Sequence, residues 1–201
     1  MTKVKICGIR NEMEARWALE AGADALGFVF AESKRKIDVE SAAHICAGLP
    51  SEVMKIGVFV NETKEFLEEI YRDVNLDYVQ LHGDESADFC HDLGLPYIKA
   101  IGVKEKEDLV GVGHFGGGLI LLDSGNGPYR GGNGTTFDWS YADASTYHQQ
   151  MILAGGLTAE NVREAITKVR PYMVDVSSGV ETEGRKDRKK IQSFIREAKS
   201  L

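Results

Sequence analysis

The sequence predicts an α/β protein, a single-domain (β/α)8 TIM barrel over residues 1–201. Three observations support this prediction. Short β-branched runs alternate with longer stretches of helical periodicity, a pattern typical of parallel strands joined by right-handed crossovers. Eight such units can be counted, which is the number that closes this barrel. The length of 201 residues allows about 25 residues per unit, at the lower limit for the fold.

Eight segments have the composition of buried strands. In order they are residues 3–7 (KVKIC), 25–30 (ALGFVF), 55–60 (KIGVFV), 78–83 (YVQLHG), 97–103 (YIKAIGV), 119–124 (LILLDS), 151–156 (MILAGG) and 172–179 (YMVDVSSG). An open doubly wound sheet is the alternative architecture, but it would normally carry a glycine-rich turn after its first strand.

Amphipathic stretches between these strands predict the helices, among them residues 11–22, 61–74 and 158–169. Asn11 and Thr158 stand at the start of two of them, where their side chains can accept a hydrogen bond from a free backbone amide. Gly22 is suited to the end of the first helix.

Two glycine-rich stretches resemble nucleotide-binding motifs without meeting their requirements. GVGHFG at 111–116 fits GxGxxG, but it follows a helical stretch and runs into a strand, the reverse of the dinucleotide fingerprint. GNGPYRGGNG at 125–134 has no Lys-Ser or Lys-Thr to complete a P-loop. Neither stretch is expected to bind a nucleotide.

The net charge of −7 and the pI near 5.3 argue against nucleic acid as a partner, although a local pocket can still bind a small anion. The basic run GRKDRKK at 184–190 is interpreted as the solvated start of the last helix. No apolar run is long enough to span a membrane and no secretory signal pattern is seen, so a cytoplasmic location is expected.

Three cysteines, without CxxC or Cys/His pairing, predict neither a zinc site nor a disulfide framework. Cys46 and Cys90 lie in helical patterns and are expected to be small core residues. Cys7 instead ends the first strand.

Side chains of one parity along each barrel strand face the helices, and those of the other parity face the interior. The apolar set expected to face the helices is Val4, Ile6, Ile56, Val58, Val60, Val79, Leu81, Val174 and Val176. The polar set expected to face inward is Lys5, Cys7, Gln80, His82, Lys99, Asp123, Asp175 and Ser177. Burial of a polar group inside a barrel costs free energy unless the group is paired or has a functional role. Lys5 is therefore expected to pair with Asp175.

The inward polar residues gather toward the carboxyl ends of the strands, where active sites of this fold lie. Cys7 is therefore expected to belong to a site. Gly155 and Gly156 follow the seventh strand, and Ser178 and Gly179 follow the eighth. Loops at these two positions commonly bind phosphate in this fold.

A series of motifs runs along the chain in the order KICGIRN (5–11), GADALGFVF (22–30), SKR (33–35), IGVFVN (56–61), VQLHGDE (79–85), LLDS (121–124), GGNGTTFDW (131–139), LAGGLTAENV (153–162) and VDVSSGVE (174–181). In these motifs the chain resembles the phosphoribosylanthranilate isomerase family of tryptophan biosynthesis, over its whole length.

The resemblance implies a cofactor-free, metal-free Amadori rearrangement of N-(5-phosphoribosyl)anthranilate, a small phosphorylated substrate, to 1-(2-carboxyphenylamino)-1-deoxyribulose 5-phosphate. It places the general base at Cys7 and the general acid at Asp123, and it implies that Arg35 binds the anthranilate carboxylate. The remaining implied site residues are Gln80, His82 and Asp175 for the substrate and Gly155, Gly156, Ser178 and Gly179 for the phosphate.

Two positions depart from the family pattern. Lys36 stands where an aromatic residue is common, and Asn133 stands where Thr or Ser is common, in a loop expected to fold over the substrate.

A free thiol is only a few per cent thiolate at neutral pH. We therefore expect a lowered Cys7 pKa in the substrate complex, with Lys5 as the cation that lowers it.

Three other functions are the alternatives. A sibling isomerase acting on a phosphoribosyl imidazole in histidine synthesis would usually show two aspartates and two half-barrels, which are not evident here. An aldolase would need a Schiff-base lysine, and Lys99 lies too early in its strand. A non-catalytic sugar-phosphate-binding barrel would need neither the thiol nor the carboxyl group. The oligomeric state is left open.

Overall fold

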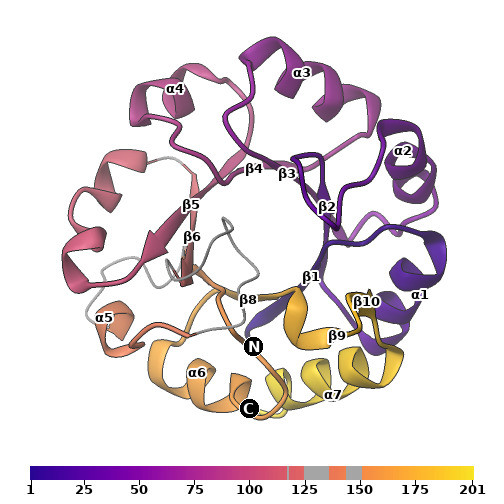
Figure 1. Cartoon of the computed structure of the whole chain (residues 1–201), viewed down its shortest axis with the longest axis vertical. Coiled ribbons are helices and arrows are strands. Elements are labelled where there is room, and N and C mark those ends of the chain that lie inside the picture. Colours follow the sequence, from indigo (N-terminus) through magenta and orange to yellow (C-terminus); the bar gives the residue numbers. More distant parts are fainter. Residues whose placement is uncertain (117, 125–135, 144–150) are drawn as a thin grey trace.

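The computed structural model describes residues 1–116, 118–124, 136–143 and 151–201. Eight parallel strands close into a barrel in chain order, with β8 pairing back onto β1. The strands are β1 Lys3–Cys7, β2 Ala25–Val29, β3 Met54–Phe59, β4 Tyr78–Leu81, β5 Tyr97–Val103, β6 Leu119–Ser124, β7 Met151–Leu153 and β8 Met173–Val176. Figure 1 shows them as an inner ring with the helices outside. The predicted (β/α)8 barrel is confirmed.

Helices cover the outside of the sheet. They are α1 Glu12–Ala21, α2 Val39–Ala47, α3 Lys64–Asp73, α4 Ala87–Asp92, α5 Ser140–Asp143, α6 Val162–Val169 and α7 Arg188–Ala198. After β5 the connection contains two 3₁₀ helices, Lys106–Leu109 and Val112–Phe115. The second lies within the GVGHFG stretch and leads into β6. No helix in the described ranges is long and apolar enough to cross a membrane.

The start of α1 is as predicted, whereas the start of α6 is not. The Asn11 side chain accepts a hydrogen bond from the Glu14 amide at 2.9 Å, and Gly22 ends α1 with φ +94°. Thr158 was expected to begin the later helix. Instead its hydroxyl accepts from the Glu160 amide in a turn, and the helix begins after Asn161.

The parity expected for strand 3 is wrong. Ile56 belongs to the apolar cluster inside the barrel, and Val58 packs with Cys7 and Val29 in a second inner cluster. Apolar residues occur in both parities of this strand, so the pattern alone did not fix its orientation. Phe59 faces the helices and stacks on the Phe30 ring with centroids 5.2 Å apart, because the larger ring fills the space beneath the helical layer.

The inward orientation expected for Lys99 is also wrong. Ile98 and Ala100 occupy the barrel interior, so Lys99 points to the helix side. Its ammonium group donates to the Glu85 carboxylate at 2.8 Å and to the Gly83 carbonyl at 2.7 Å. The buried charge is thus paired outside the barrel, away from the inward polar residues.

Cys46 and Cys90 pack in the helix-facing core, as predicted. Burial raises the pKa of Cys46 to about 12 and that of Cys90 to about 11. A buried thiol of this kind stays protonated near neutral pH and acts as a small apolar side chain.

Aspartates brace the amino-terminal end of the barrel. The Asp77 carboxylate, just before β4, accepts from the Lys55 backbone amide at 2.8 Å, and the Asp77 amide donates back to the Lys55 carbonyl at 2.8 Å. Asp24, just before β2, makes the same reciprocal pair with Val4 of β1, at 2.8 and 2.9 Å. Each aspartate therefore fixes the register of the preceding strand at its start.

We expect Asp77→Ala to lower the free energy of unfolding by about 1–3 kcal/mol, because it leaves the Lys55 amide without its charged acceptor. Urea unfolding followed by circular dichroism measures the change. Asp73→Ala is the control: among the described residues its carboxylate meets only Arg72 on the surface, at 3.5 Å, and the loss should stay within about 0.5 kcal/mol. Equal losses in the two variants would contradict this role for Asp77.

Candidate active site

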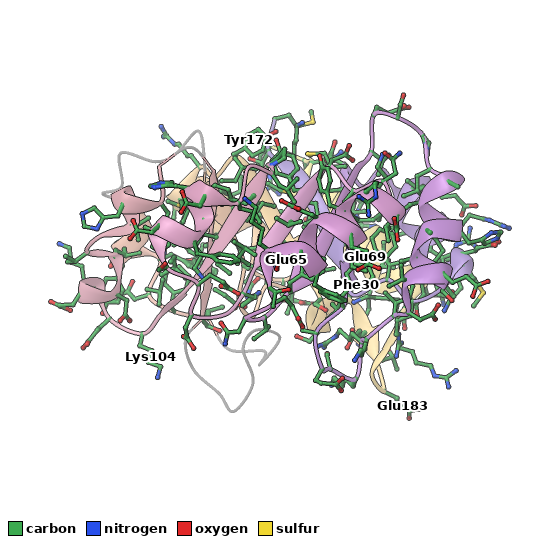
Figure 2. All side chains as sticks on the ribbon, turned by 90° about the horizontal axis from the view of Figure 1, so that it is seen from above. Phe30, Glu65, Glu69, Lys104, Tyr172 and Glu183 are labelled. Carbon is green, nitrogen blue, oxygen red and sulfur yellow. The ribbon has the colours of Figure 1, made fainter. Side chains whose placement is uncertain are left out.

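A cavity of about 630 Å³ opens among the carboxyl ends of the strands and the loops that follow them. Figure 2 shows the two ends of the barrel: Lys104 after β5 and Glu183 after β8 lie on one face, and Tyr172 before β8 lies on the other. The cavity lining contains every residue predicted for the site, namely Cys7, Arg35, Gln80, His82, Asp123, Gly155, Gly156, Asp175, Ser178 and Gly179. Their roles remain predictions at this point.

Lys5 is the fully buried cation beneath this cavity. It lies on β1 directly opposite Asp175 on β8, and its ammonium group donates to the Asp175 carboxylate at 3.0 Å and to the Gln80 side-chain oxygen at 2.8 Å. Burial by itself would lower the pKa of Lys5, but the neighbouring Asp175 and Cys7 outweigh burial and raise the pKa. The predicted Lys5–Asp175 pair is confirmed.

The Cys7 thiol lies between Lys5 and β2. Gly27 is its partner in the ladder, and a Cβ atom there would come within 2.8 Å of the Cys7 sulfur and 3.0 Å of the Lys5 side chain. Only glycine therefore leaves room for both groups. Burial raises the pKa of Cys7, opposed by Lys5 and Lys186. This direction is opposite to the one expected for the substrate complex, because burial outweighs the two cations in this structure.

A hydrogen-bonded chain orients Gln80 and His82. An ammonium group can only donate, so the Gln80 oxygen must face Lys5 and the Gln80 NH₂ group must face His82 Nδ1, 3.0 Å away. The Nδ1 atom is then an acceptor, which places the ring proton on Nε2 by inference from the network. The Nε2 atom lies 3.5 Å from Asp123 Oδ2. Lys5 thus sets the tautomer of the histidine beside Asp123.

Two carboxylate oxygens of the cavity are buried without a hydrogen-bond partner among the described residues. They are Oδ1 of Asp123 and Oδ1 of Asp175. Buried polar atoms are nearly always hydrogen-bonded in folded proteins, so atoms of this kind in a cavity point to a ligand that supplies the partners. A ligand with several hydroxyl groups meets that need.

The glycine loops after β7 and β8 approach each other closely. Gly155 and Gly156 have φ of +84° and +61°, and a Cβ atom on Gly179 would lie 1.9 Å from the Leu157 carbonyl oxygen. Within the described part of the chain, the amides of these glycines and of Ser178 donate no hydrogen bond. Converging free amides are suited to an anion such as a phosphate group.

The opposite side of the cavity is apolar. Val29, Val58 and Val60 line it, from β2, β3 and the residue after β3. The parity predicted from the sequence directs Val58 and Val60 toward the helices, which is wrong, so this apolar side was not predicted. A flat apolar ring could pack here beside the polar groups.

Arg35, from the loop after β2, forms a bidentate ion pair with Glu181. Its Nε and Nη2 atoms donate to the two Glu181 oxygens at 2.7 and 2.9 Å. Burial by itself would lower the pKa of Arg35, but Glu181 outweighs it and the pKa is raised. Despite burial, the hydrogen bond from Arg35 and the charge of Lys186 lower the pKa of Glu181 to about 2.

Lys186 is the second cation on Glu181, at 2.9 Å, and it also donates to the Ser177 carbonyl and hydroxyl oxygens at 3.0 and 3.3 Å. The Ser177 hydroxyl itself donates to the Cys7 carbonyl, so it must accept from Lys186. Three donated bonds require an ammonium group rather than a neutral amine. Burial lowers the pKa of Lys186, and Glu181 opposes that shift.

Neither Glu181 nor Lys186 is among the residues predicted from the sequence. Glu181 stands at the end of the VDVSSGVE motif, and Lys186 lies in the basic run that we interpreted as solvated. That interpretation is wrong for Lys186, which is buried in the short hairpin of β9 (Glu181–Thr182) and β10 (Arg185–Lys186) before α7. The signal available in the sequence was a two-residue loop that includes Gly184, because a loop of this length with glycine is typical of a hairpin turn.

The structure describes one of the two positions that depart from the family pattern. Lys36 pairs with Glu32 and is not among the residues that line the cavity. Asn133 and the GNGPYRGGNG stretch lie outside the described residues. Among the described residues, no three His, Cys, Asp or Glu side chains are placed to hold a metal ion.

The Glu181 cluster predicts a pH-dependent part of stability. The folded pKa of about 2 lies below the ordinary 4.5, so the stabilisation is complete above about pH 5 and is lost as the pH falls toward 2. We expect the free energy of unfolding of the wild type to exceed that of Glu181→Gln by on the order of 3 kcal/mol at pH 7. At pH 3 we expect a difference of about half of that or less. Urea unfolding at a series of pH values measures the difference. A difference that stays constant with pH would contradict the ion-pair origin.

The chain is similar in sequence and in fold to proteins of known family. Residues 4–197 match the family N-(5'-phosphoribosyl)anthranilate (PRA) isomerase. An N-(5'-phosphoribosyl)anthranilate isomerase of Bacillus cereus (strain G9842) is 50% identical over 199 residues, covering 98% of each chain.

Two solved structures extend the comparison. The crystal structure of phosphoribosyl anthranilate isomerase from Thermotoga maritima has a TM-score of 0.92 and 44% identity, with both chains covered completely. A phosphoribosyl anthranilate isomerase in complex with reduced 1-(o-carboxyphenylamino)-1-deoxyribulose 5-phosphate has a TM-score of 0.87 and 43% identity, again over 100% of both chains. The chain described here belongs to the N-(5'-phosphoribosyl)anthranilate isomerase family.

Proposed function

We propose that this chain isomerises N-(5-phosphoribosyl)anthranilate to 1-(2-carboxyphenylamino)-1-deoxyribulose 5-phosphate in tryptophan biosynthesis, with Cys7 as general base and Asp123 as general acid. The observation that carries the proposal is the lining of a single cavity: a thiol from β1 and a carboxyl group from β6, together with an arginine and two glycine loops. Membership of the family supports the reaction.

The reaction needs one acid and one base. Asp123 gives its proton to the ring oxygen as the bond from that oxygen to C1 breaks, and the anthranilate nitrogen, which keeps its hydrogen, forms a protonated imine with C1. Cys7 then removes the proton from C2, which gives the enolamine, and tautomerisation of the enolamine gives the ketone product. The enzyme has then lost one proton from the carboxyl group and gained one on the thiol, so its total proton count is unchanged.

The reactive form therefore holds a thiolate and a carboxylic acid at the same time. With ordinary pKa values for the two group types, only about one molecule in 10⁴ to 10⁵ would be in that form. We infer that Lys5 and Lys186 hold the thiolate when substrate is bound. Both cations act on the thiol against the effect of burial.

The two oxygens of Asp123 have different surroundings, which supports an acid role. Oδ2 faces the His82 ring nitrogen at 3.5 Å, while Oδ1 has no partner in the described part of the chain. A proton on Oδ1 would be the one available to a ligand. His82 is then a positioning residue, because it acts on the reaction through Asp123.

The remaining contacts follow from the chemistry of the lining. The substrate phosphate would bind the free amides of Gly155, Gly156, Ser178 and Gly179, and its hydroxyl groups would meet the unpartnered oxygen of Asp175. The aromatic ring would pack on the valine wall. The ring carboxylate would pair with Arg35, as the family resemblance implies.

Turnover of phosphoribosylanthranilate by the purified protein tests the function. We expect conversion to be unchanged by excess EDTA, because the proposed steps use only the protein's own acid and base. Loss of anthranilate fluorescence on conversion measures the rate. Binding of the substrate without turnover would favour a non-catalytic sugar-phosphate-binding barrel, and a requirement for metal would contradict the mechanism.

Substitution of the acid and base tests their roles separately. We expect Cys7→Ser and Asp123→Asn each to lower kcat by about 10²–10⁴-fold, the usual contribution of a positioned acid or base. KM should change far less, because neither group carries the phosphate or carboxylate contact. Cys46→Ser is the control for loss of a buried thiol away from the cavity. A Cys7→Ser or Asp123→Asn variant with near wild-type kcat would refute the role of that residue.

A further inference from the structure

Glu181 lies at the centre of a buried three-charge cluster at the edge of the cavity. It accepts two hydrogen bonds from Arg35 and one from Lys186. Its side chain and that of Lys186 are 5% and 0% exposed. Two positive charges and one negative charge leave a net charge of plus one, beside a cavity proposed to take an anionic ligand.

The pairing occupies one edge of the Arg35 guanidinium group. Nε and one hydrogen of Nη2 are used by Glu181, which leaves both hydrogens of Nη1 and the second hydrogen of Nη2. No acceptor in the described part of the chain contacts Nη1. The free edge has the two-nitrogen geometry that binds a carboxylate in a bidentate manner.

The stem of Arg35 is fixed as well. A Cβ atom at Gly8, whose φ is +81°, would lie 2.6 Å from the Arg35 Cδ atom, so the stem rests against the backbone next to Cys7. With its stem on Gly8 and its head on Glu181, the arginine has little freedom to reorient. An arginine held in this way loses less entropy when it binds a ligand.

We propose that Glu181, itself held by Lys186, is a positioning residue that makes the site selective for a substrate whose aromatic ring carries a carboxylate, by fixing the free edge of Arg35. This inference rests on the proposed function, in which Arg35 meets that carboxylate. Glu181 does not touch the substrate in this scheme. It acts through the orientation of the arginine.

Charge and geometry make opposite predictions for loss of the Glu181 carboxylate. Glu181→Gln raises the net charge of the cluster from plus one to plus two, which by electrostatics alone would strengthen binding of a carboxylate. It also removes one of the two acceptors that align Arg35, which would weaken bidentate binding. The sign of the effect therefore distinguishes a positioning residue from a neutralising one.

The experiment compares two ligands by isothermal titration calorimetry. One is reduced 1-(o-carboxyphenylamino)-1-deoxyribulose 5-phosphate, and the other is the same molecule without the ring carboxyl group. Their affinity ratio measures carboxylate preference. We expect Glu181→Gln to lower this ratio by about tenfold or more, because hydrogen bonds to a charged group are lost, while binding of the carboxyl-free ligand changes little.

Two further variants keep the test sharp. Glu181→Asp retains the charge but shortens the side chain by one methylene group, so a lowered ratio there too would identify geometry as the cause. Arg35→Ala should abolish the preference, and Glu181→Gln added to it should have no further effect.

Glu85→Gln is the matched control. It removes a carboxylate that pairs with a buried lysine, Lys99 at 2.8 Å, outside the cavity, and it should leave the ratio unchanged. A ratio that is unchanged or raised in both Glu181 variants would overturn the inference while wild-type turnover still supports the proposed function. A wild type without turnover and without carboxylate preference would refute both.

Discussion

The buried Lys5 ammonium group is the constraint on which the site depends. An unpaired charge in this position would cost several kcal/mol, so the fold must bring acceptors to it. Closure of the barrel does so: β8 pairs with β1 in a register that places Asp175 opposite Lys5, and β4 supplies Gln80 from across the interior. The stability of the barrel and the order of the site are therefore linked through one cation.

Lys5 influences both groups that are proposed for the chemistry, the thiol of Cys7 and the carboxyl group of Asp123. On one side Lys5 favours a thiolate at Cys7, which fits beside it because the neighbouring strand carries Gly27. On the other side it fixes Gln80, and Gln80 fixes the His82 tautomer beside Asp123. The proposed base and acid are thus oriented by the same buried charge, although they lie on β1 and β6.

The cluster of Arg35, Glu181 and Lys186 is a second charged centre with a different form. Lys5 and Asp175 make a neutral pair, whereas this cluster keeps a net positive charge and one guanidinium edge that has no partner in the described part of the chain. It also joins the loop after β2 to the hairpin after β8, and through Ser177 it reaches the Cys7 carbonyl. The backbone that carries the thiol and the proposed anion-binding cluster are therefore connected by hydrogen bonds.

The sequence by itself determined the eight strands, the closed barrel and the gathering of nine of the ten predicted residues at one end, because alternation and strand-end position follow from local periodicity; Arg35 was placed there only by the family resemblance. It gave the wrong orientation for strand 3 and for Lys99 of strand 5, since KIGVFV and YIKAIGV carry apolar residues in both parities. It also could not find Glu181 and Lys186. Whether a lysine in a basic run is solvated or buried depends on which carboxylate the folded chain brings beside it, and only the packing of the hairpin after β8 against the loop after β2 decides that.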